Sequence, residues 1–297
     1  MKTMEKIHIV IPVFNGWKQT KICLDALRAS LYRNLEIIVV DHGSTDETKE
    51  ALPALYPEII HVLGAATLWW TGATNLGIRT AITRGAETIM LLNNDCYVTP
   101  ETIERLVSHA KEIDEAIIAP VQRDFFSKRL LCITASTCYL LGFPTFLRLG
   151  KNVSVLGEPR LLATKLIIGG RGVLIPRSVF ERMGMFDEVN LPHAGSDNDF
   201  YLRCRRQQVP LMIATDATVY VDSTRTTLAA NLEQMDLKQF LQTLTDRRSH
   251  RNIRDLNTLF KLHYPIRGLH HLGVALNLFR YFVLYGWKRL RRALSSR

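Results

Sequence analysis

The sequence lacks the patterns that would place it in several common protein classes. Its five cysteines are scattered over 297 residues without a C-x-x-C pair, so we expect neither a disulfide framework nor a structural zinc site. No run of about 18 uncharged apolar residues occurs, which argues against a conventional spanning helix. The lysines before the first apolar run lead into a strand pattern with no cleavage site, so we expect no signal peptide.

Two nucleotide-binding patterns are also missing. The first predicted strand is not followed by G-x-G-x-x-G, which excludes a dinucleotide-dependent oxidoreductase of the common type. The P-loop pattern G-x-x-x-x-G-K-[ST] does not occur either. A nucleotide-binding function would therefore need a different kind of site.

Positive charge is concentrated at the end of the chain. The formal net charge is +10, but residues 247–297 contain twelve Lys or Arg and one acid, Asp255, so the preceding residues are close to neutral. A protein that binds nucleic acid would carry basic residues over its folded body. The distribution favours a near-neutral domain with a basic C-terminal element for anchoring or docking, and no nucleic acid partner.

Apolar runs alternate with helical patterns, and 47% hydrophobic residues can fill a large core. This alternation predicts an α/β fold: a Rossmann-like, mostly parallel central sheet with helices on both faces. The expected strands are residues 7–14, 35–41, 58–64, 88–95, 116–122, 165–176 and 210–221. The expected helices are 17–31, 72–84, 100–112, 177–184, 200–207 and 269–292, with further helical residues in 228–264. The stretch 124–165 gives no clear prediction.

Polar side chains follow three predicted strands at the point where each strand ends. Asn15 follows the first, Asp41 ends the second, and Asn93-Asn94-Asp95 follows the fourth. The carboxyl ends of parallel strands form the edge where open α/β sheets bind ligands. Asp95 is a hard oxygen ligand suited to Mg²⁺ or Mn²⁺, with substrate phosphates completing the coordination. The alternative is that these are ordinary turn residues.

A second acidic group lies in the sequence GSDND at residues 195–199. Asp199 and Arg203 are four residues apart and can pair on one face of a helix, which leaves Asp197 free. A free carboxylate beside a bound substrate can act as general base for an acceptor hydroxyl. The alternative is a capped helix with an ordinary surface ion pair.

Aromatic residues lie near the same predicted edge. Phe14 offers a stacking surface, and Asp41 on the neighbouring strand can accept hydrogen bonds from a base or a ribose. The alternative places Phe14 in the core and makes Asp41 a cap. Trp69 and Trp70 either pack beneath the loop after the third strand or present a ring to a sugar or base.

The order of these segments resembles family 2 glycosyltransferases. The matching segments are VIPVFN, IIVVDHGSTDET, TGATNLGI, LLNND, GGRGVLIPRSVFERMGMFDE and SDNDFYLR, in this order over residues 7–225. The resemblance implies the GT-A fold and transfer from a nucleotide-diphosphate sugar, such as a UDP- or dTDP-sugar, with inversion at the anomeric carbon. Within the family the chain looks most like bacterial enzymes of polysaccharide, lipopolysaccharide or cell-wall glycan synthesis, including rhamnosyltransferases that use dTDP-rhamnose.

The resemblance also implies roles for single residues. Asp197 takes the position of the catalytic base, and Asp95 that of the ligand to a Mg²⁺ or Mn²⁺ cofactor. The nucleotide is expected to contact Pro12, Phe14, Asn15, Asp41, Asn75, Arg79, Asn93 and Asn94. The donor and acceptor sugar pocket is expected to contain Trp70, Gly169, Gly170, Arg171 and Asp199.

Several positions depart from the family pattern. Asn93 replaces the first acid of the metal-binding DxD, and Ser196 replaces the Glu that commonly precedes Asp197. Val221 stands near the position of a metal-binding His, which leaves Asp222 as a substitute ligand. These departures keep a second hypothesis open, a nucleotide-sugar-binding module with weakened catalysis.

The resemblance divides the chain into two parts. Residues 1–227 form the predicted catalytic domain, with a nucleotide-binding half to about residue 95 and an acceptor-binding half from 96 to 227. Residues 228–297 form a helical, basic C-terminal region. Donor and acceptor specificity is expected from 124–165 and from the loop 187–196, so the sugar and the acceptor are not predicted.

The last predicted helix, residues 269–292, is amphipathic. Arg280 interrupts it, which disfavours a spanning helix and favours one lying in the interface of an anionic membrane. The alternative is a helix packed on the catalytic domain. The membrane hypothesis predicts a cytoplasmic protein, peripheral on the inner membrane, with a glycan or polyprenyl-diphosphate-linked acceptor. The apolar stripe is Leu272, Leu276, Phe279, Val283, Trp287 and Leu290, and the basic end is Lys288, Arg289, Arg291, Arg292 and Arg297.

Overall fold

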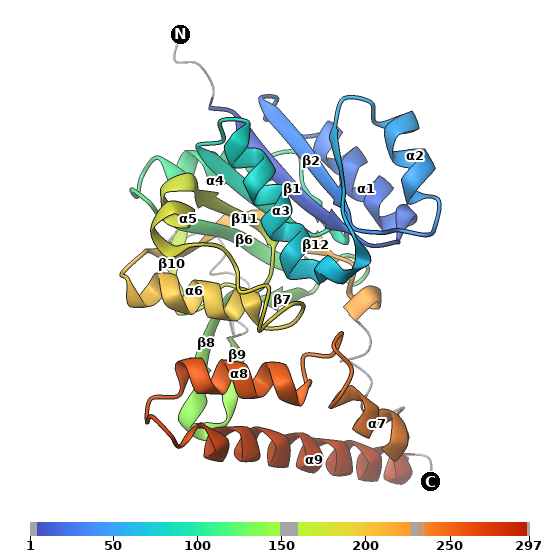
Figure 1. The fold of residues 1–297 in the computed structure, drawn as a ribbon, viewed down its shortest axis with the longest axis vertical. Coiled ribbons are helices and arrows are strands. Elements are labelled where there is room, and N and C mark those ends of the chain that lie inside the picture. The colour runs from blue at the N-terminus through green and yellow to red at the C-terminus, as the bar shows by residue number, and fades with distance from the viewer. Residues whose placement is uncertain (1–4, 149–159, 227–231, 233–234, 296–297) are drawn as a thin grey trace.

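The computed structural model describes residues 5–148, 160–226, 232 and 235–295, and Figure 1 follows the chain through them. The strands are β1 (Ile7–Val13), β2 (Leu35–Asp41), β3 (Ile60–Leu63), β4 (Thr88–Leu92), β5 (Cys96–Val98), β6 (Ile117–Asp124), β7 (Leu130–Cys132), β8 (Thr134–Cys138), β9 (Phe143–Arg148), β10 (Leu161–Ala163), β11 (Arg171–Pro176) and β12 (Leu211–Val221). The helices are α1 (Trp17–Arg28), α2 (Thr48–Leu55), α3 (Trp69–Thr83), α4 (Thr102–Ala110), α5 (Arg177–Met183), α6 (Ser196–Arg206), α7 (Leu237–Thr243), α8 (Ile253–His263) and α9 (His270–Ser295). Short 3-10 turns include η2 (Tyr139–Leu141).

One large sheet contains ten of the described strands. Its order is β10-β12-β6-β11-β4-β1-β2-β3, with β5 paired to β12 and β7 to β6. Strands β3, β2, β1 and β4 are parallel neighbours, β11 runs antiparallel between β4 and β6, and β12 is parallel to β6. The predicted α/β fold with a mostly parallel central sheet is confirmed. The carboxyl ends of β1, β2 and β4 therefore meet at one edge.

Helices cover both faces of the sheet (Figure 1), so its central strands are apolar on both sides. In β1, Ile9 and Ile11 join the core that contains residues of α1 and α4, whereas Val10 joins the core on the α3 side. Gly77 lets α3 approach the sheet closely, because a Cβ there would meet the side chains of Val10 and Val40. Burial on both faces explains why this strand is a continuous apolar run.

Some predicted boundaries are wrong. Residues 165–170 form a loop with one isolated bridge at Leu166, and only 171–176 form a strand. Gly169 has a φ of 67°, in the left-handed region, which interrupts the extended backbone expected there. Helix α3 begins at Trp69 instead of residue 72, and α6 begins at Ser196 instead of residue 200. Both helices therefore include residues that the sequence pattern places in the preceding loops.

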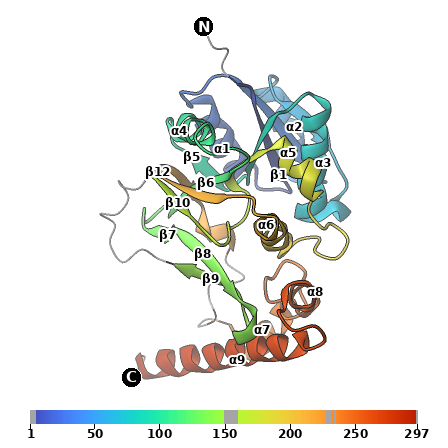
Figure 2. The ribbon, with the colours of Figure 1, turned by 90° about the vertical axis from the view of Figure 1, so that its left-hand side faces the viewer.

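The stretch without a clear prediction contains four short strands in its described part. Strand β7 pairs with β6, and β10 pairs with β12, so both extend the large sheet. Strands β8 and β9 instead pair with each other and form a hairpin that points away from the sheet toward the C-terminal helices (Figure 2). Residues 149–159 lie outside the described part of the chain.

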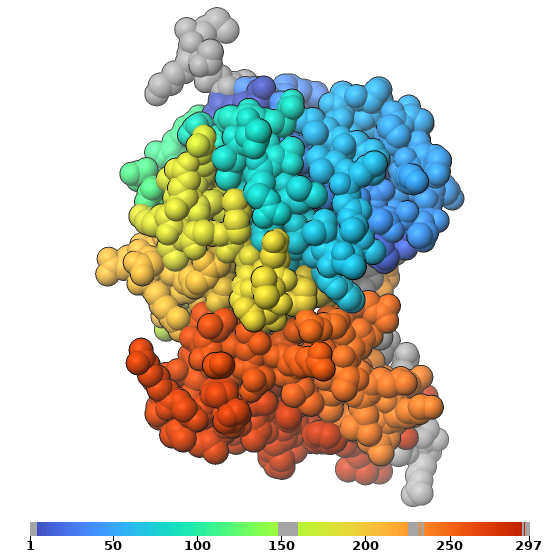
Figure 3. All heavy atoms as spheres, in the orientation of Figure 1, coloured from blue at the N-terminus to red at the C-terminus, as the bar shows by residue number. Residues whose placement is uncertain are grey.

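Helices α7, α8 and α9 form a layer against the sheet domain, visible in orange and red in Figure 3. The described part of the predicted helical stretch 228–264 contains two helices, with a loop between them. The hairpin joins this layer because Asn277 Nδ2 donates to the carbonyl of Gly142 at 2.6 Å and Arg280 stacks over the ring of Phe143. No helix in the described ranges has both the length and the hydropathy needed to cross a bilayer.

Candidate functional site

The loops after β1 and β2 are locked together at the sheet edge. Asn15 has a φ of 58°, and its side-chain Oδ1 accepts hydrogen bonds from the backbone amides of Thr45 at 2.7 Å and Asp46 at 3.2 Å. In return, Asp46 Oδ2 accepts from the amides of Gly16 at 2.6 Å and Trp17 at 3.0 Å. These reciprocal bonds hold the amino terminus of α1 beside the loop that leads to α2.

Asp41 and Phe14 line this edge in different ways. Asp41 is buried at the end of β2, and its Oδ1 accepts from the amide of Ser44 at 2.8 Å. Phe14 is exposed and stacks on His42, with ring centroids 5.4 Å apart. Burial lowers the pKa of His42 to about 4, against the opposing effect of Asp41, so this imidazole is neutral at pH 7. The edge therefore presents an accessible aromatic face next to a buried carboxylate.

The NND sequence after β4 lies at the same edge. Asn94 Nδ2 donates to Thr20 Oγ1 at 3.0 Å, which connects this loop to α1. Asn93 Oδ1 accepts from Trp70 Nε1 at 2.9 Å, and the backbone N–H of Asn93 donates to the carbonyl of Gly170 at 2.7 Å. A Cβ on Gly170 would lie 3.2 Å from the Trp70 ring, so glycine permits this close approach. Asn93 is thus a connector between the α3 start and the β11 loop.

Asp95 and Asp222 lie side by side. The amide of Asp222 donates to the carbonyl of Asp95 at 2.8 Å, at the junction of β5 and β12. Burial raises the pKa of Asp95; the Arg171 charge opposes this effect, and the Asp222 charge adds to it. The Asp222 carboxylate accepts from the Thr224 amide at 3.0 Å and, more weakly, from Gln19 Nε2 at 3.5 Å.

This pair fits a hard divalent cation. Among the described residues no three His, Cys, Asp or Glu side chains converge on a point. Mg²⁺ and similar ions are often bound through one or two carboxylates, with water and substrate phosphates as the other ligands. Asp95 and Asp222 supply this kind of oxygen set, and a cation between them would relieve their repulsion.

Asp197 lies in the first turn of α6, opposite the β11 loop. Its Oδ2 accepts from the backbone amide of Gly169 at 2.8 Å, and Tyr201 donates its hydroxyl to the Gly169 carbonyl at 3.2 Å. Burial raises the pKa of Asp197, while backbone hydrogen bonds and the Arg171 charge act in the opposite direction. A carboxylate with a raised pKa is a better proton acceptor than one with the ordinary pKa.

Arg171 connects the two acidic groups. Its guanidinium acts on the pKa of both Asp95 and Asp197, so it lies within electrostatic range of each. It is held by Gln122, whose Oε1 accepts from Arg171 NH1 at 2.8 Å and whose Nε2 donates to the carbonyl of Ile168 at 3.1 Å. Gln122 is absent from the residues predicted for the site, because it lies within an apolar strand pattern and belongs to no motif.

Ser196, the residue before Asp197, forms an internal contact. It is fully buried, and its Oγ lies 2.8 Å from Thr71 Oγ1, which also donates to the carbonyl of Leu191 at 2.7 Å. These bonds tie the first turns of α3 and α6 to the loop before α6. In the segment 195–199, it is the Asp197 carboxylate that contacts the loop before β11.

Three residues expected to bind nucleotide are engaged within the protein. Pro12 is buried inside β1. Asn75 Nδ2 donates to the Phe186 carbonyl at 2.9 Å and to Glu188 Oε2 at 2.8 Å, so it secures the loop before α6. Arg79 is half-exposed and lies 4.0 Å from Glu188. The contacts of Asn75 and Arg79 hold the loop 184–195 against α3.

The predicted pairing of Asp199 with Arg203 is present. Arg203 Nε donates to Asp199 Oδ2 at 2.8 Å. The other oxygen, Oδ1, lies 2.9 Å from His263 Nε2, at the end of α8. Both carboxylate oxygens are occupied in a buried position, where the side chain connects elements of the fold.

The family follows from a direct comparison. Residues 8–180 match the model of the family described as glycosyl transferase family 2. The chain belongs to this family. An uncharacterized glycosyltransferase of Rickettsia prowazekii is 28% identical over 186 residues, which cover 61% of this chain and 54% of that protein. This family 2 chain therefore spans about half the length of that curated relative.

Solved structures agree with this family 2 assignment at the level of the fold. TarS 1-349 of S. aureus has a TM-score of 0.57 at 14% identity, covering 96% of this chain and 91% of TarS 1-349. A mannosyltransferase of Pyrobaculum calidifontis, solved with GDP-Man and Mn²⁺, has a TM-score of 0.56 at 16% identity, covering 98% and 74%. The fold is the GT-A fold, as predicted.

Proposed function

We propose that this family 2 glycosyltransferase moves a sugar from a nucleotide-diphosphate sugar to an acceptor hydroxyl, with inversion at the anomeric carbon. One observation carries the proposal: the loop before β11 contacts both acidic segments, because the Gly170 carbonyl accepts from the backbone amide of Asn93 at 2.7 Å and the Gly169 amide donates to Asp197 at 2.8 Å. This loop, which leads into Arg171, therefore joins a carboxylate suited to a metal, Asp95, to a carboxylate suited to accept a proton, Asp197.

The proposed reaction is a single displacement. The acceptor oxygen attacks the anomeric carbon while its proton passes to the Asp197 carboxylate. The bond between the anomeric carbon and the diphosphate oxygen breaks, and the nucleoside diphosphate leaves with the electron pair. Arg171, oriented by Gln122, stabilises the negative charge that develops on the leaving diphosphate.

We assign the metal to Asp95 and Asp222. A bound Mg²⁺ or Mn²⁺ would supply Lewis-acid stabilisation of the diphosphate. Asn93 contributes no charge to this site, because its side chain is a neutral amide, and its Oδ1 accepts the hydrogen bond from Trp70. The related mannosyltransferase was solved with Mn²⁺, which supports a divalent cofactor for this chain.

The donor base is proposed to lie at the edge formed by Phe14, Asn15 and Asp41, with Asn94 beside it. Trp70, Gly169 and Gly170 form one side of the proposed sugar pocket. TarS has been solved with UDP and with UDP-GlcNAc, which supports a nucleotide sugar as donor here. We propose a UDP- or dTDP-sugar, with dTDP-rhamnose among the candidates.

A ligand panel tests this proposal. Thermal shift with nucleoside diphosphates and nucleotide sugars should give one preferred base, with a larger Tm increase when Mn²⁺ is present. A ligand at 100 times its Kd stabilises the folded state by about 2.7 kcal/mol, which is readily measured. Absence of stabilisation by every UDP, dTDP and GDP ligand would contradict the proposed donor site.

The alternative function is a nucleotide-sugar-binding module with weakened catalysis. It predicts binding in the ligand panel but no metal-dependent hydrolysis or transfer of the bound donor. The raised pKa of Asp197 and the presence of Arg171 favour the enzyme. Measuring release of nucleoside diphosphate from the preferred donor separates the two hypotheses.

We further propose that residues 228–297 form a region that binds anionic membrane, so that the enzyme works peripherally at the cytoplasmic face of the inner membrane. Helix α9 packs on the protein through Val274, Asn277 and Tyr281. The six residues of its predicted apolar stripe face away, and each is at least 45% exposed. This exposure supports a membrane-facing helix over one packed on the catalytic domain, and the basic residues at its end match anionic lipid.

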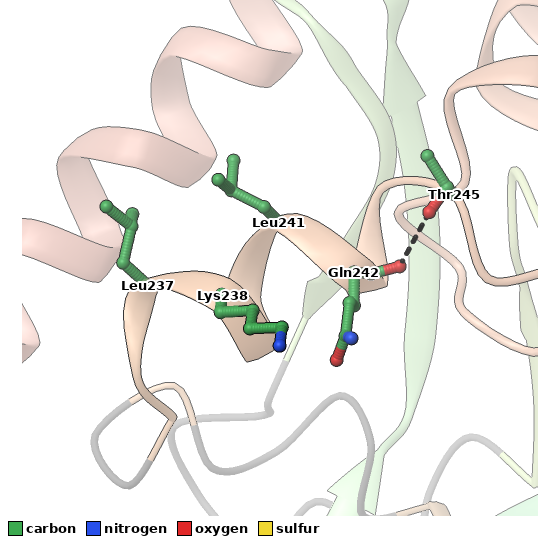
Figure 4. Close-up of a pocket in the computed structure, with 5 residues that line it drawn as sticks. All are labelled: Leu237, Lys238, Leu241, Gln242 and Thr245. Atoms are coloured by element: carbon green, nitrogen blue, oxygen red, sulfur yellow. Dashed lines mark hydrogen bonds between the residues drawn. The ribbon is translucent and has the colours of Figure 1, made fainter.

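Helix α7 extends the same exposed layer. Its Phe240 is buried and stacks on Tyr285 of α9, with ring centroids 4.5 Å apart. Leu237 and Leu241 remain exposed, and Figure 4 shows them on one side of α7, with Lys238 directed elsewhere. They line a shallow pocket with Lys238, Gln242 and Thr245. An acceptor carried on a polyprenyl diphosphate would be available at such a membrane surface.

A single exposed side chain tests membrane binding. Phe279→Glu should reduce binding to vesicles containing anionic phosphatidylglycerol by about tenfold or more, because it removes an apolar contact and adds a repulsive charge. Leu55→Glu, at an exposed position on α2, is the matched control and should leave vesicle binding unchanged. Cosedimentation measures both variants. If the parent protein does not cosediment with anionic vesicles at low salt, the membrane proposal is refuted.

A further inference from the structure

A buried charged junction connects the catalytic helix to the C-terminal helices. Asp199, in the first turn of α6, receives Arg203 on Oδ2 at 2.8 Å and His263 on Oδ1 at 2.9 Å. His263 is 64 residues away and is the last residue of α8. Asp199 and His263 are both almost entirely buried. A contact of this kind is lost only if the two helices separate or one partner is removed.

Each partner of Asp199 is held by a further element. Arg203 NH1 and NH2 donate to the carbonyls of Met183 and Met185, at 2.5 Å and 2.8 Å, where α5 ends. The His263 ring stacks on Tyr139 of η2, with centroids 5.7 Å apart and an interplanar angle of 27°. The carboxylate of Asp199 is therefore fixed from the sheet domain through Arg203 and from the C-terminal layer through His263.

Helix α8 also lies against Gly195, the residue that precedes α6. Gly195 caps α6 with a φ of 86°, and a Cβ at this position would lie 2.5 Å from Leu259 Cδ1 of α8. Asp197 lies between Gly195 and Asp199, and its carboxylate is placed by that turn against the amide of Gly169. Helix α8 thus contacts a residue two positions before the proposed general base and another two positions after it.

We propose that His263 is a positioning residue, which acts through Asp199 to hold the first turn of α6 and with it the carboxylate of Asp197. This inference rests on the function proposed above. It makes sugar transfer depend on a helix that contributes nothing to the sheet edge. Misplacement of a reacting group by about 1 Å can lower a rate by about two orders of magnitude, so a small shift of this turn is sufficient.

The test uses a second His–Asp contact as control, in which the histidine is buried and the aspartate is partly exposed. His109 is buried in α4, and its Nε2 lies 2.9 Å from Asp216 Oδ1, the same distance as in the His263 pair. In the full-length protein, His263→Leu removes the hydrogen bond, and His263→Gln retains an amide donor. His109→Leu removes the comparable pair on the other face of the sheet. Turnover, KM for the donor and Tm are measured for all three variants.

Positioning predicts a specific set of results. His263→Leu should lower kcat by about tenfold or more with little change in the donor KM, and His263→Gln should restore most of the loss. His109→Leu should lower Tm, because it also removes a contact of a buried histidine, and should leave kcat unchanged. Equal losses of kcat in the two Leu variants, or no recovery with Gln, would overturn the proposal.

Hydrogen exchange separates this inference from the proposed function. Backbone amides of 195–200 should exchange faster in His263→Leu than in the parent or in His109→Leu. Unchanged exchange in this segment would overturn the role of His263, whatever the activity. Faster exchange with unaltered kcat would instead contradict Asp197 as the general base, because its turn would have loosened without effect.

Discussion

Asp197→Asn should retain nucleotide-sugar binding and lower turnover by roughly 100-fold or more. The amide is nearly the same size as the carboxylate and can still accept the hydrogen bond from Gly169, but it cannot take the acceptor proton. Calorimetry with the preferred donor and a transfer assay together measure the two effects. Because burial raises the pKa of Asp197, the acid limb of kcat/KM should lie above the ordinary Asp value of about 3.9.

The matched control for this prediction is Asp114→Asn, which changes an exposed carboxylate in the turn after α4. It should leave turnover and the pH profile as in the parent. An Asp197→Asn variant with parental kcat would remove Asp197 from the mechanism. A variant that no longer binds the donor would instead make Asp197 part of the binding site.

Asp95→Ala should abolish the enhancement of nucleoside diphosphate binding by Mn²⁺. The carboxylate lies beside Asp222 and near Arg171, and its removal leaves one acid to hold the cation. Calorimetric titrations with Mn²⁺ and with EDTA measure the difference, which in the parent should be about tenfold or greater in Kd. In the variant the two titrations should coincide.

Asp222→Ala distinguishes a metal ligand from a charge that only shapes the site. As a ligand, Asp222 supports metal-dependent binding, and its removal should reduce the Mn²⁺ effect without eliminating it. Equal affinity of the parent protein with Mn²⁺ and with EDTA would contradict both assignments. Charge neutralisation would then be left to arginine, and Arg171→Gln would be the variant to measure.

The parts of the fold that can be predicted from the sequence are those that depend on residues close together in the chain. Strand β1 is a continuous apolar run because both of its faces are buried, and Asn15 follows it because a left-handed residue is needed where the chain turns into α1. The i, i+4 spacing predicts the Asp199–Arg203 pair, because helical geometry alone brings these side chains together.

The parts that escape prediction depend on contacts between distant segments. Gln122 reads as one polar residue in a strand, and only the fold brings it to Arg171, 49 residues away. His263 similarly meets Asp199 across 64 residues. The loop 165–170 has the pattern of a strand because its apolar residues fill the core without extended pairing. Sequence spacing carries no signal for any of these arrangements.

The hairpin of β8 and β9 has a consequence for how this chain can diverge. It belongs to the middle of the sequence, yet Gly142 and Phe143 dock on α9. A boundary between residues 227 and 228 therefore separates the two regions in sequence, but contacts between the hairpin and α9 still cross it. A C-terminal region from another glycosyltransferase would have to bring a matching hairpin with it, because recombination at that boundary would separate Asn277 from its acceptor. We therefore expect a working graft of the C-terminal region to exchange the hairpin as well.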